Sequence, residues 1–245
     1  MKILVCITHV PDTTSRIAFT DDNTKFDTNG IQFIIGPYDD YALARAVELK
    51  EASGGSITVL NVGGPETEPT IRKALAIGAD EAIRVNAEPT DSYFVAKEIA
   101  NVAKDGDYDL ILMGRESIDF NGGMVHGMVG ELLGLPSFSP VMTLDIEGDT
   151  AKMSREIEGG KEHLEVKLPF VAGCQEPIAE WKIPNMRGIM SARTKPLNVV
   201  EPSGSETRTQ LEKYELPPAK GEVKMIDADN VEKLVDLLKN EAKVI

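Results

Sequence analysis

The chain has 245 residues, of which 42% are hydrophobic and 27% are charged, so it contains enough apolar material for a packed core. Its formal net charge of -14 leaves no basic surplus to displace counterions from phosphates, which argues against a nucleic-acid binder. Cys6 and Cys174 lie far apart in apolar surroundings, so we expect two buried thiols and a reducing compartment rather than a disulfide framework.

The first 135 residues alternate short apolar runs with amphipathic runs of helical length, which predicts βα units stacked around a mainly parallel sheet. The predicted strands are Ile3–Thr8, Ile57–Val62, Ala82–Val85 and Leu110–Met113. The predicted helices are Tyr41–Lys50, Thr70–Ile77, Tyr93–Ala103 and Val125–Leu133. Gly78 and Gly134 fall where helix C-caps favour a residue that tolerates positive φ. Because Met1–Ile7 reads as a strand and not as a signal peptide, and no Arg-rich leader precedes it, we expect a bacterial cytoplasmic protein.

From Ser137 to Gly173 apolar residues alternate with period two, on two arms joined through Gly159-Gly160. The alternating residues are Met153, Ile157, Leu164, Val166 and Leu168. This pattern predicts an antiparallel hairpin added to the parallel sheet. The segment 186–196 that follows is basic and rich in Met, which is typical of a surface that contacts another protein.

Beyond Pro196 the chain is expected to be irregular, since residues 201–207 read as a linker and 216–218 contain two prolines. A last helix is predicted to begin near the cap candidates Asp227 and Asp229 and to run to about Glu241. The sequence therefore divides into an α/β domain at residues 1–196 and an extended arm with a terminal helix at 197–245.

Ligands of an open parallel sheet bind outside the carboxyl ends of its strands, so we expect a site in the loops after Thr8, Val62 and Met113. Gly63 and Gly64 follow one of these strands, and the segment 114–123 contains three glycines before a predicted helix. Such glycines allow backbone N–H groups to approach an anion at the helix N-terminus, although they also suit simple tight turns. Three such loops together favour a nucleotide site.

The sequence lacks the common catalytic and phosphate-binding motifs. There is no Gly-x-Gly-x-x-Gly after the first strand, no Gly-Lys-Ser/Thr loop and no Gly-x-Ser-x-Gly elbow. His9, His126 and His163 have no Cys or carboxylate at metal-ligand spacing. We therefore predict no catalytic or metal-binding residues, and a carrier or binding protein rather than an enzyme.

The chain resembles the β (small) subunit of electron transfer flavoprotein over essentially its whole length. Four elements in matching order carry the resemblance: Gly36-Pro37-Tyr38-Asp39 leading into 46–50, residues 70–80, Arg155-Glu156-Ile157-Glu158-Gly159-Gly160 with Glu162, Leu164 and Lys167-Leu168-Pro169, and Arg187-Gly188-Ile189-Met190-x-Ala192. The resemblance implies a Rossmann-like sheet of the adenine nucleotide alpha hydrolase type. It also implies an αβ heterodimer in which the large subunit holds most of a redox FAD and this chain supplies an AMP site.

By the same resemblance, the nucleotide and flavin are approached by four segments: Cys6; Gly36, Pro37, Tyr38 and Asp39; Val62 and Gly63; and Gly114, Arg115, Ser117, Ile118, Asp119, Asn121, Gly122, Gly123, Met124 and Val125. Tyr38 is expected to approach the flavin. Gly36 stands where the family often has Asn, and residues 123–125 stand where AMP-binding members usually show Asn-Gln-Thr. The backbone N–H groups of Gly122 and Gly123 are expected to replace those side chains.

The resemblance also assigns partner contacts. Glu156 on the hairpin is expected to face the mobile flavin domain of the large subunit, although an exposed Glu is often merely solvated. Met186 is expected to anchor redox partners from a segment without regular structure, together with Arg187, Ile189 and Met190.

The implied function is electron carriage in fatty acid β-oxidation, from acyl-CoA dehydrogenases to a membrane quinone reductase. One alternative is an electron-bifurcating member with a second FAD in place of AMP. The Asp-Gly-Asp-Thr-type motif expected after Asp119 in such members is absent, which argues against this alternative. Another is a free-standing nucleotide sensor, which does not need a hairpin and an arm that face a partner.

Overall fold

The computed structural model describes residues 1–245, which form two compact units. The first unit consists of Met1–Ala18 and Asp27–Glu212, and the second of Phe19–Phe26 with Lys213–Ile245. None of the helices is long and apolar enough to cross a membrane.

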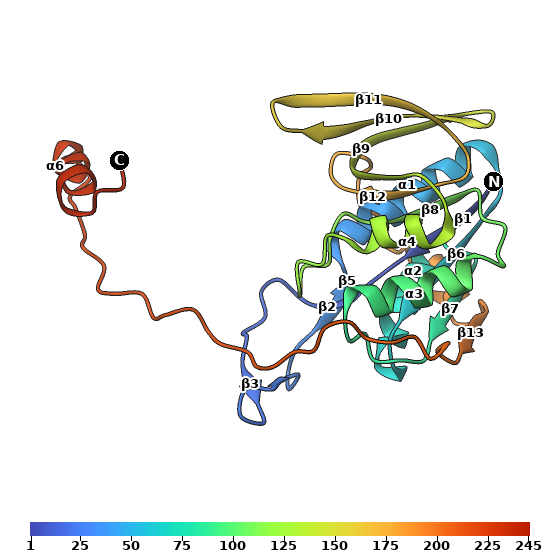
Figure 1. Ribbon diagram of the computed structural model, residues 1–245, viewed down its shortest axis with the longest axis horizontal. Coiled ribbons are helices and arrows are strands. Elements are labelled where there is room, and N and C mark those ends of the chain that lie inside the picture. The colour runs from blue at the N-terminus through green and yellow to red at the C-terminus, as the bar shows by residue number, and fades with distance from the viewer. The chain divides into compact units, whose positions relative to one another are not determined.

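A nine-stranded sheet forms the centre of the first unit, in the order β11-β10-β9-β12-β8-β1-β6-β7-β13 (Figure 1). Its strands are β1 (Lys2–Cys6), β6 (Ser56–Val62), β7 (Glu81–Val85), β8 (Leu110–Gly114), β9 (Ser137–Glu147), β10 (Thr150–Ile157), β11 (Gly160–Lys167), β12 (Phe170–Cys174) and β13 (Leu197–Val200). β1 pairs in parallel with both β6 and β8, whereas β10 pairs antiparallel with β9 and β11. The predicted α/β class with an added hairpin is confirmed.

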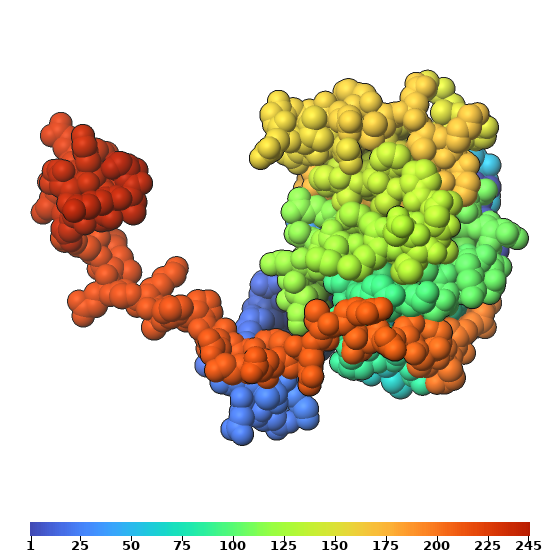
Figure 2. All heavy atoms as spheres, in the orientation of Figure 1, coloured from blue at the N-terminus to red at the C-terminus, as the bar shows by residue number.

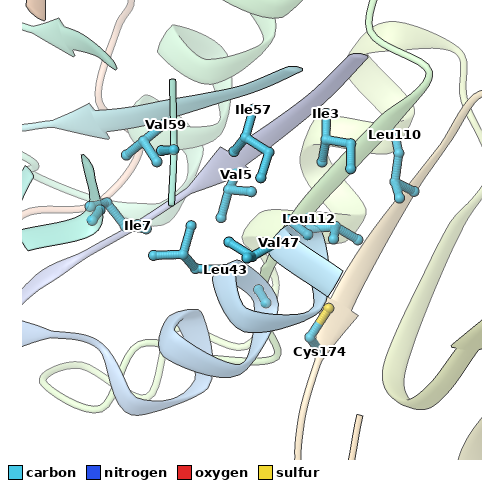
Figure 3. Packing of buried hydrophobic residues seen from close by; sticks show 14 of the residues in the cluster. Ile3, Val5, Ile7, Leu43, Val47, Ile57, Val59, Leu110, Leu112 and Cys174 are labelled. Carbon is cyan, nitrogen blue, oxygen red and sulfur yellow. The ribbon is translucent and has the colours of Figure 1, made fainter. Parts of the chain in front are cut away.

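Helices cover both faces of the parallel strands. They are α1 (Pro37–Ser53), α2 (Glu68–Ile77), α3 (Ser92–Ala103), α4 (Val125–Leu133) and α5 (Met186–Ala192), with a 3-10 turn at Pro65–Thr67. Alternate residues of β1 contribute to two cores. Ile3 and Val5 pack with α1 and α2 (Figure 3). Leu4 and Cys6 face the other side of the sheet and pack with α3. Burial on both faces explains why these strands read as continuous apolar runs.

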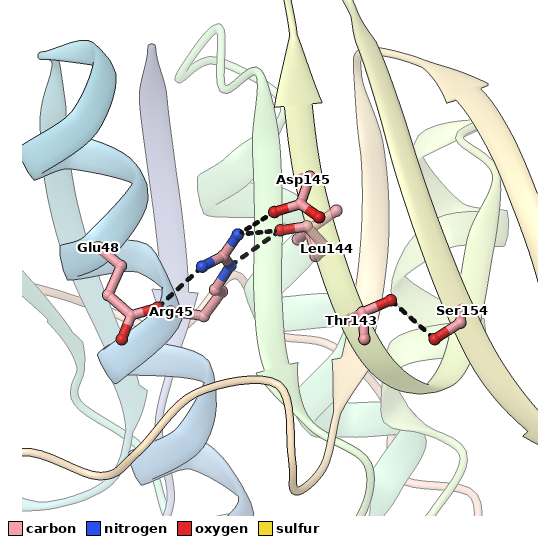
Figure 4. Close-up of polar contacts among 6 residues, drawn as sticks. All are labelled: Arg45, Glu48, Thr143, Leu144, Asp145 and Ser154. Carbon is pink, nitrogen blue, oxygen red and sulfur yellow. Dashed lines mark hydrogen bonds and ion pairs between the residues drawn. The ribbon is translucent and has the colours of Figure 1, made fainter.

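Arg45 connects α1 to the antiparallel part of the sheet (Figure 4). Its Nε donates to the Leu144 carbonyl on β9 at 2.8 Å, and its guanidinium pairs with Glu48 and Asp145, each at 2.8 Å. The antiparallel strands β10 and β11 extend this part of the sheet as a hairpin, drawn in yellow at one end of the first unit in Figure 2. The hairpin is thus built on the same framework as the parallel strands.

Short strands complete the fold. β2 (His9–Pro11) pairs with β5 (Phe33–Ile35) in the first unit, and β3 (Phe19–Thr20) pairs with β4 (Lys25–Phe26) in the second. Within the second unit the Phe19 ring stacks on that of Tyr214, with 4.7 Å between centroids. Its helix α6 (Val231–Asp236) continues as a π-helical turn at Leu237–Glu241. Strands of two or three residues are too short to leave a period-two pattern.

Three predictions about local structure are wrong. Phe170–Cys174 pairs in parallel with β8, so the antiparallel region ends before it. The chain is not irregular directly beyond Pro196, because β13 adds in parallel to the edge strand β7. The last helix is capped by Asn230, whose side chain accepts from the amide of Lys233, and not by Asp227 or Asp229. The functional division of the chain at 196/197 stays a prediction.

The two predicted C-cap glycines differ in their physical reason. Gly134 has a φ of 67° and is a left-handed C-cap, as predicted. Gly78 also ends its helix, but its φ of 162° is extended backbone. A Cβ at Gly78 would lie 2.6 Å from Cγ2 of Val47, so close packing of α2 on α1 requires the glycine here.

Candidate functional site

One buried carboxylate joins the carboxyl ends of β1 and β8. Oδ2 of Asp39, in the first turn of α1, accepts hydrogen bonds from the Thr8 amide at 2.8 Å and from the Thr8 hydroxyl at 2.6 Å. Its Oδ1 accepts from the Gly114 amide at 2.7 Å. From β1 the chain continues to β6 on one side, and β8 lies on the other, so this is the switch point of the sheet. Ligands of open α/β sheets bind at such points.

Asp39 is held there without a cation, since no Lys, Arg or His nitrogen lies within 4 Å of its carboxylate. Burial raises the pKa of Asp39 to about 6, against the hydrogen bonds from Thr8 and Gly114, which favour the charged form. A Cβ at Gly36 would collide with the Thr8 hydroxyl and the Asp39 carboxylate. The compact hydrogen-bonded arrangement therefore accounts for Gly36 at this position.

The loop between β8 and α4 begins with an anchored arginine. The Arg115 amide donates to the Cys174 carbonyl at 2.9 Å, and its guanidinium lies over the Tyr38 ring, 5.1 Å from the centroid. Its Nη2 lies 3.3 Å from the Glu116 carboxylate. The stacked guanidinium fixes the Tyr38 ring at the carboxyl edge.

The start of α4 has the features that an anion requires. Met124 provides no side-chain cap, and the first helical hydrogen bond runs from the Met128 amide to the Met124 carbonyl, so the preceding amides are left for another acceptor. A Cβ at Gly123 would meet nothing nearer than 3.7 Å, and one at Gly127 nothing within 4 Å. A phosphate therefore fits here. The Gly123 amide itself donates to the Asn121 carbonyl at 2.8 Å, so it does not replace a lost side chain as expected.

The rest of the predicted nucleotide segments lie around this edge. Cys6 ends β1, Pro37 begins α1, and Val62 ends β6 with Gly63 directly after it. The β8–α4 loop carries Arg115, Ser117, Ile118, Asp119, Asn121, Gly122, Gly123 and Met124, and Val125 begins α4. The Ser117 hydroxyl donates to the Asp119 carboxylate within the loop. Burial raises the pKa of the Cys6 thiol, so Cys6 is a neutral thiol at this edge of the sheet.

Sequence reasoning missed Arg84, on β7. Its Nη1 donates to the Gly63 carbonyl at 2.8 Å and to Asn86 Oδ1 at 2.9 Å, while the Gly63 amide donates to the Val85 carbonyl at 3.0 Å. The loop after β6 is thus held from the neighbouring strand. A charged residue among the apolar residues of the run Ala82–Val85 was the signal that could have identified it.

The predicted partner segment forms a helix, so the expectation of irregular structure at Met186 is wrong. Met186 is the first residue of α5, which begins because the Asn185 side chain accepts from the Gly188 amide at 2.8 Å. The inner side of α5 packs closely on α2, where a Cβ at Gly188 would collide with the Ala76 carbonyl. Arg72 Nη1 donates to the Ala192 carbonyl at 2.9 Å.

Large apolar side chains around α5 are exposed to solvent. They are Trp181, Ile183, Met186, Ile189 and Met190. Met186 is 73% exposed, which places it outside the core as predicted. Trp181 and Ile183 were not among the predicted contacts, although apolar residues beside Pro184 were a usable signal.

Glu156 is exposed on β10 but has a protein partner. Its Oε2 accepts from Gln175 Nε2 at 3.0 Å, and the adjacent Arg155 pairs with Glu162 across the hairpin at 2.6 Å. Glu156 is therefore not simply solvated.

Known proteins similar to this chain share one family name. A family model described as "Electron transfer flavoprotein domain" matches residues 23–205. The electron transfer flavoprotein subunit beta of Bacillus subtilis is 35% identical, and all of both chains is covered. The subunit of the same name from Syntrophomonas wolfei is 34% identical over all of this chain and 98% of its own. That of Homo sapiens is 28% identical over 100% of this chain and 99% of its own.

Proposed function

The chain belongs to the electron transfer flavoprotein family, as a β subunit, and from this premise we propose that it pairs with a large subunit to form a heterodimeric FAD-containing electron carrier. The carrier accepts electrons from acyl-CoA dehydrogenase-type flavoenzymes and passes them to a membrane quinone reductase. FAD, held mostly by the large subunit, supplies the redox chemistry when bound. This chain supplies positioning, electrostatics and docking surfaces.

The observation that carries this proposal is the exposed apolar surface around α5. Trp181, Ile183 and Met186 lie in the open beside the charged residues Lys182 and Arg187. An apolar anchor with a polar rim suits a weak, specific contact, and fast exchange between redox partners requires weak contacts. The surface of the hairpin around Glu156 is proposed to meet a basic residue of the mobile flavin domain.

A nucleotide, AMP, is proposed at the carboxyl edge. The uncapped start of α4 would hold its phosphate, with Gly122 and Gly123 leaving space for close approach. The loops at Gly36–Asp39 and Val62–Gly63 would enclose the rest of the nucleotide. Tyr38, held by Arg115, would face the flavin from this subunit.

Gly123→Val tests this site. The structure has room for the added side chain, because no atom lies within 3.7 Å of a Cβ there, and Gly123 has no left-handed φ. The variant complex should therefore form and keep its FAD while losing AMP. Gly221→Val is the matched control, since a Cβ at Gly221 also meets open space, and it should keep both nucleotides. Retention of AMP by the Gly123→Val complex would contradict the proposed site.

A second FAD in place of AMP is the alternative, and one observation favours it. Phe120 and Met124 are exposed apolar side chains in the β8–α4 loop, next to the glycines at 122 and 123. An isoalloxazine or a second base packs well against such groups. The two readings differ in one countable property, the number of FAD molecules per heterodimer.

A further inference from the structure

Gln175, directly after β12, bridges the hairpin and the loop that follows β8. Its Oε1 accepts from Arg115 Nη1 at 2.8 Å, and its Nε2 donates to Glu156 Oε2 at 3.0 Å. The backbone amide of Gln175 donates to the Val141 carbonyl at 3.0 Å. Gln175 is only 7% exposed, and its backbone amide is held by β9. Its side chain is therefore fixed between the half-buried Arg115 and the exposed Glu156.

The orientation of the Gln175 amide is dictated by its neighbours. A guanidinium has only donors and a carboxylate has only acceptors, so the oxygen faces Arg115 and the NH₂ group faces Glu156. Both hydrogen bonds involve a charged group, which makes them stronger than neutral ones. A hydrophobic residue at position 175 would break both bonds at once.

Arg115 extends the connection to the carboxyl edge. Its guanidinium lies over the Tyr38 ring at 5.1 Å, so a continuous contact path runs from Glu156 through Gln175 and Arg115 to Tyr38. The path joins four segments that are far apart in the sequence: the hairpin, the end of β12, the end of β8 and the start of α1. Nothing in the local sequence around Gln175 indicates this.

We propose that Gln175 is a positioning residue that pre-orders the Glu156 carboxylate for the basic group of the flavin domain. This inference rests on the docking role of Glu156 in the proposed function. An exposed Glu that is free to rotate must lose conformational freedom when a partner binds it, whereas one already held by an amide has lost it in the free carrier. Gln175 thereby favours the domain orientation that transfers electrons, without contacting the flavin domain itself.

The test compares Gln175→Glu, Gln175→Leu and Glu156→Gln in the co-expressed heterodimer. Gln175→Glu keeps an acceptor for Arg115 but places a second carboxylate beside Glu156, and Gln175→Leu removes both bonds. Gln210→Glu, at an exposed position, controls for the added charge. Electron transfer from a reduced acyl-CoA dehydrogenase is measured at equal FAD-loaded heterodimer, with kcat and KM separated.

We expect both Gln175 variants to lower kcat about three- to tenfold, with KM for the dehydrogenase changed less than about twofold, since docking at α5 is untouched. The Glu156→Gln/Gln175→Leu double variant should be no slower than Glu156→Gln alone, because both act on one contact. Wild-type kcat in both Gln175 variants, alongside a slowed Glu156→Gln, would overturn the inference and leave the proposed function standing. So would independent, multiplicative effects in the double variant. Wild-type kcat in Glu156→Gln would instead remove the proposed role of Glu156, and the inference with it.

Discussion

The carboxyl edge of the sheet and the surface around α5 differ in opposite ways from an ordinary protein, since the first buries a charged group and the second exposes apolar groups. At the edge, a charged group is buried, and Asp39 satisfies both of its oxygens with donors from Thr8 and Gly114. Around α5, apolar groups such as Met186 and Ile183 lie largely in solvent, 73% and 75% exposed. The first region satisfies its buried charge within this chain, whereas the second leaves an apolar surface that, in the proposed function, a redox partner covers.

The second unit resembles the α5 surface in this respect. Its helix α6 has no buried residue. The second unit also exposes the apolar side chains of Val223 and Met225, which precede this helix. A six-residue helix with no buried face does not stabilise itself in water. The second unit is thus also expected to be covered by a partner.

The largest expected effect follows from these uncovered surfaces. Expressed alone, the chain should be poorly soluble and carry little flavin, whereas co-expression with its large subunit should give a yellow 1:1 complex. Absorbance of the purified protein and its mass in solution check this directly. A colourless, monodisperse monomer that the large subunit leaves unchanged would contradict the proposed heterodimer.

The buried edge should show itself as a pH dependence of stability. Asp39 has a pKa of about 6 in the folded chain against an ordinary value of 3.8, so the folded state binds more protons between these values. The free energy of unfolding therefore falls as pH rises through this window, by about 3 kcal/mol in total, roughly half of it above pH 5.

The control is Asp39→Asn, which has nearly the same size and does not titrate. The variant loses hydrogen bonds at every pH, so the informative quantity is the difference between wild-type and variant stability as a function of pH. This difference should change between pH 5 and 7.5 in the direction given above. A flat difference would mean that Asp39 is charged throughout and that water or another group compensates its burial.

Truncation of Met186 should show that this side chain anchors a partner and is not part of the core. Met186→Ala should cost about 1 to 3 kcal/mol of partner binding with little loss of folding stability. Met153→Ala is the matched comparison: Met153 is buried in the core at the base of the hairpin, and its truncation should cost about 2 to 5 kcal/mol of stability. Electron transfer from an acyl-CoA dehydrogenase and thermal unfolding are measured on both. If Met186→Ala melts like the core variant and transfers electrons normally, the placement of the docking surface is wrong.

The sequence predicted the elements whose patterns are long. Burial on both faces gives the central strands continuous apolar runs, and α3 and α4 repeat apolar residues at helical spacing, so their existence was predictable to within a few residues. β13 was missed because an edge strand of four residues after a proline looks like a linker. Helix α5 was missed because seven residues that include Gly188 give too little periodicity.

The switch-point rule predicts a site in the loops after β1, β6 and β8, and that a nucleotide binds there stays a prediction. At this edge the structure brings Asp39 together with Thr8 and Gly114, a contact that the sequence did not indicate. The roles of Arg84 and Gln175 depend on side chains that meet across strands, which a single sequence does not encode in its local pattern. Such contacts follow from strand order and register.

The nucleotides released from the purified heterodimer, identified and counted by mass spectrometry, show what the two subunits hold together. We expect one FAD and one AMP per heterodimer. Two FAD molecules per heterodimer, or an FAD with no second nucleotide, would contradict the proposed AMP site.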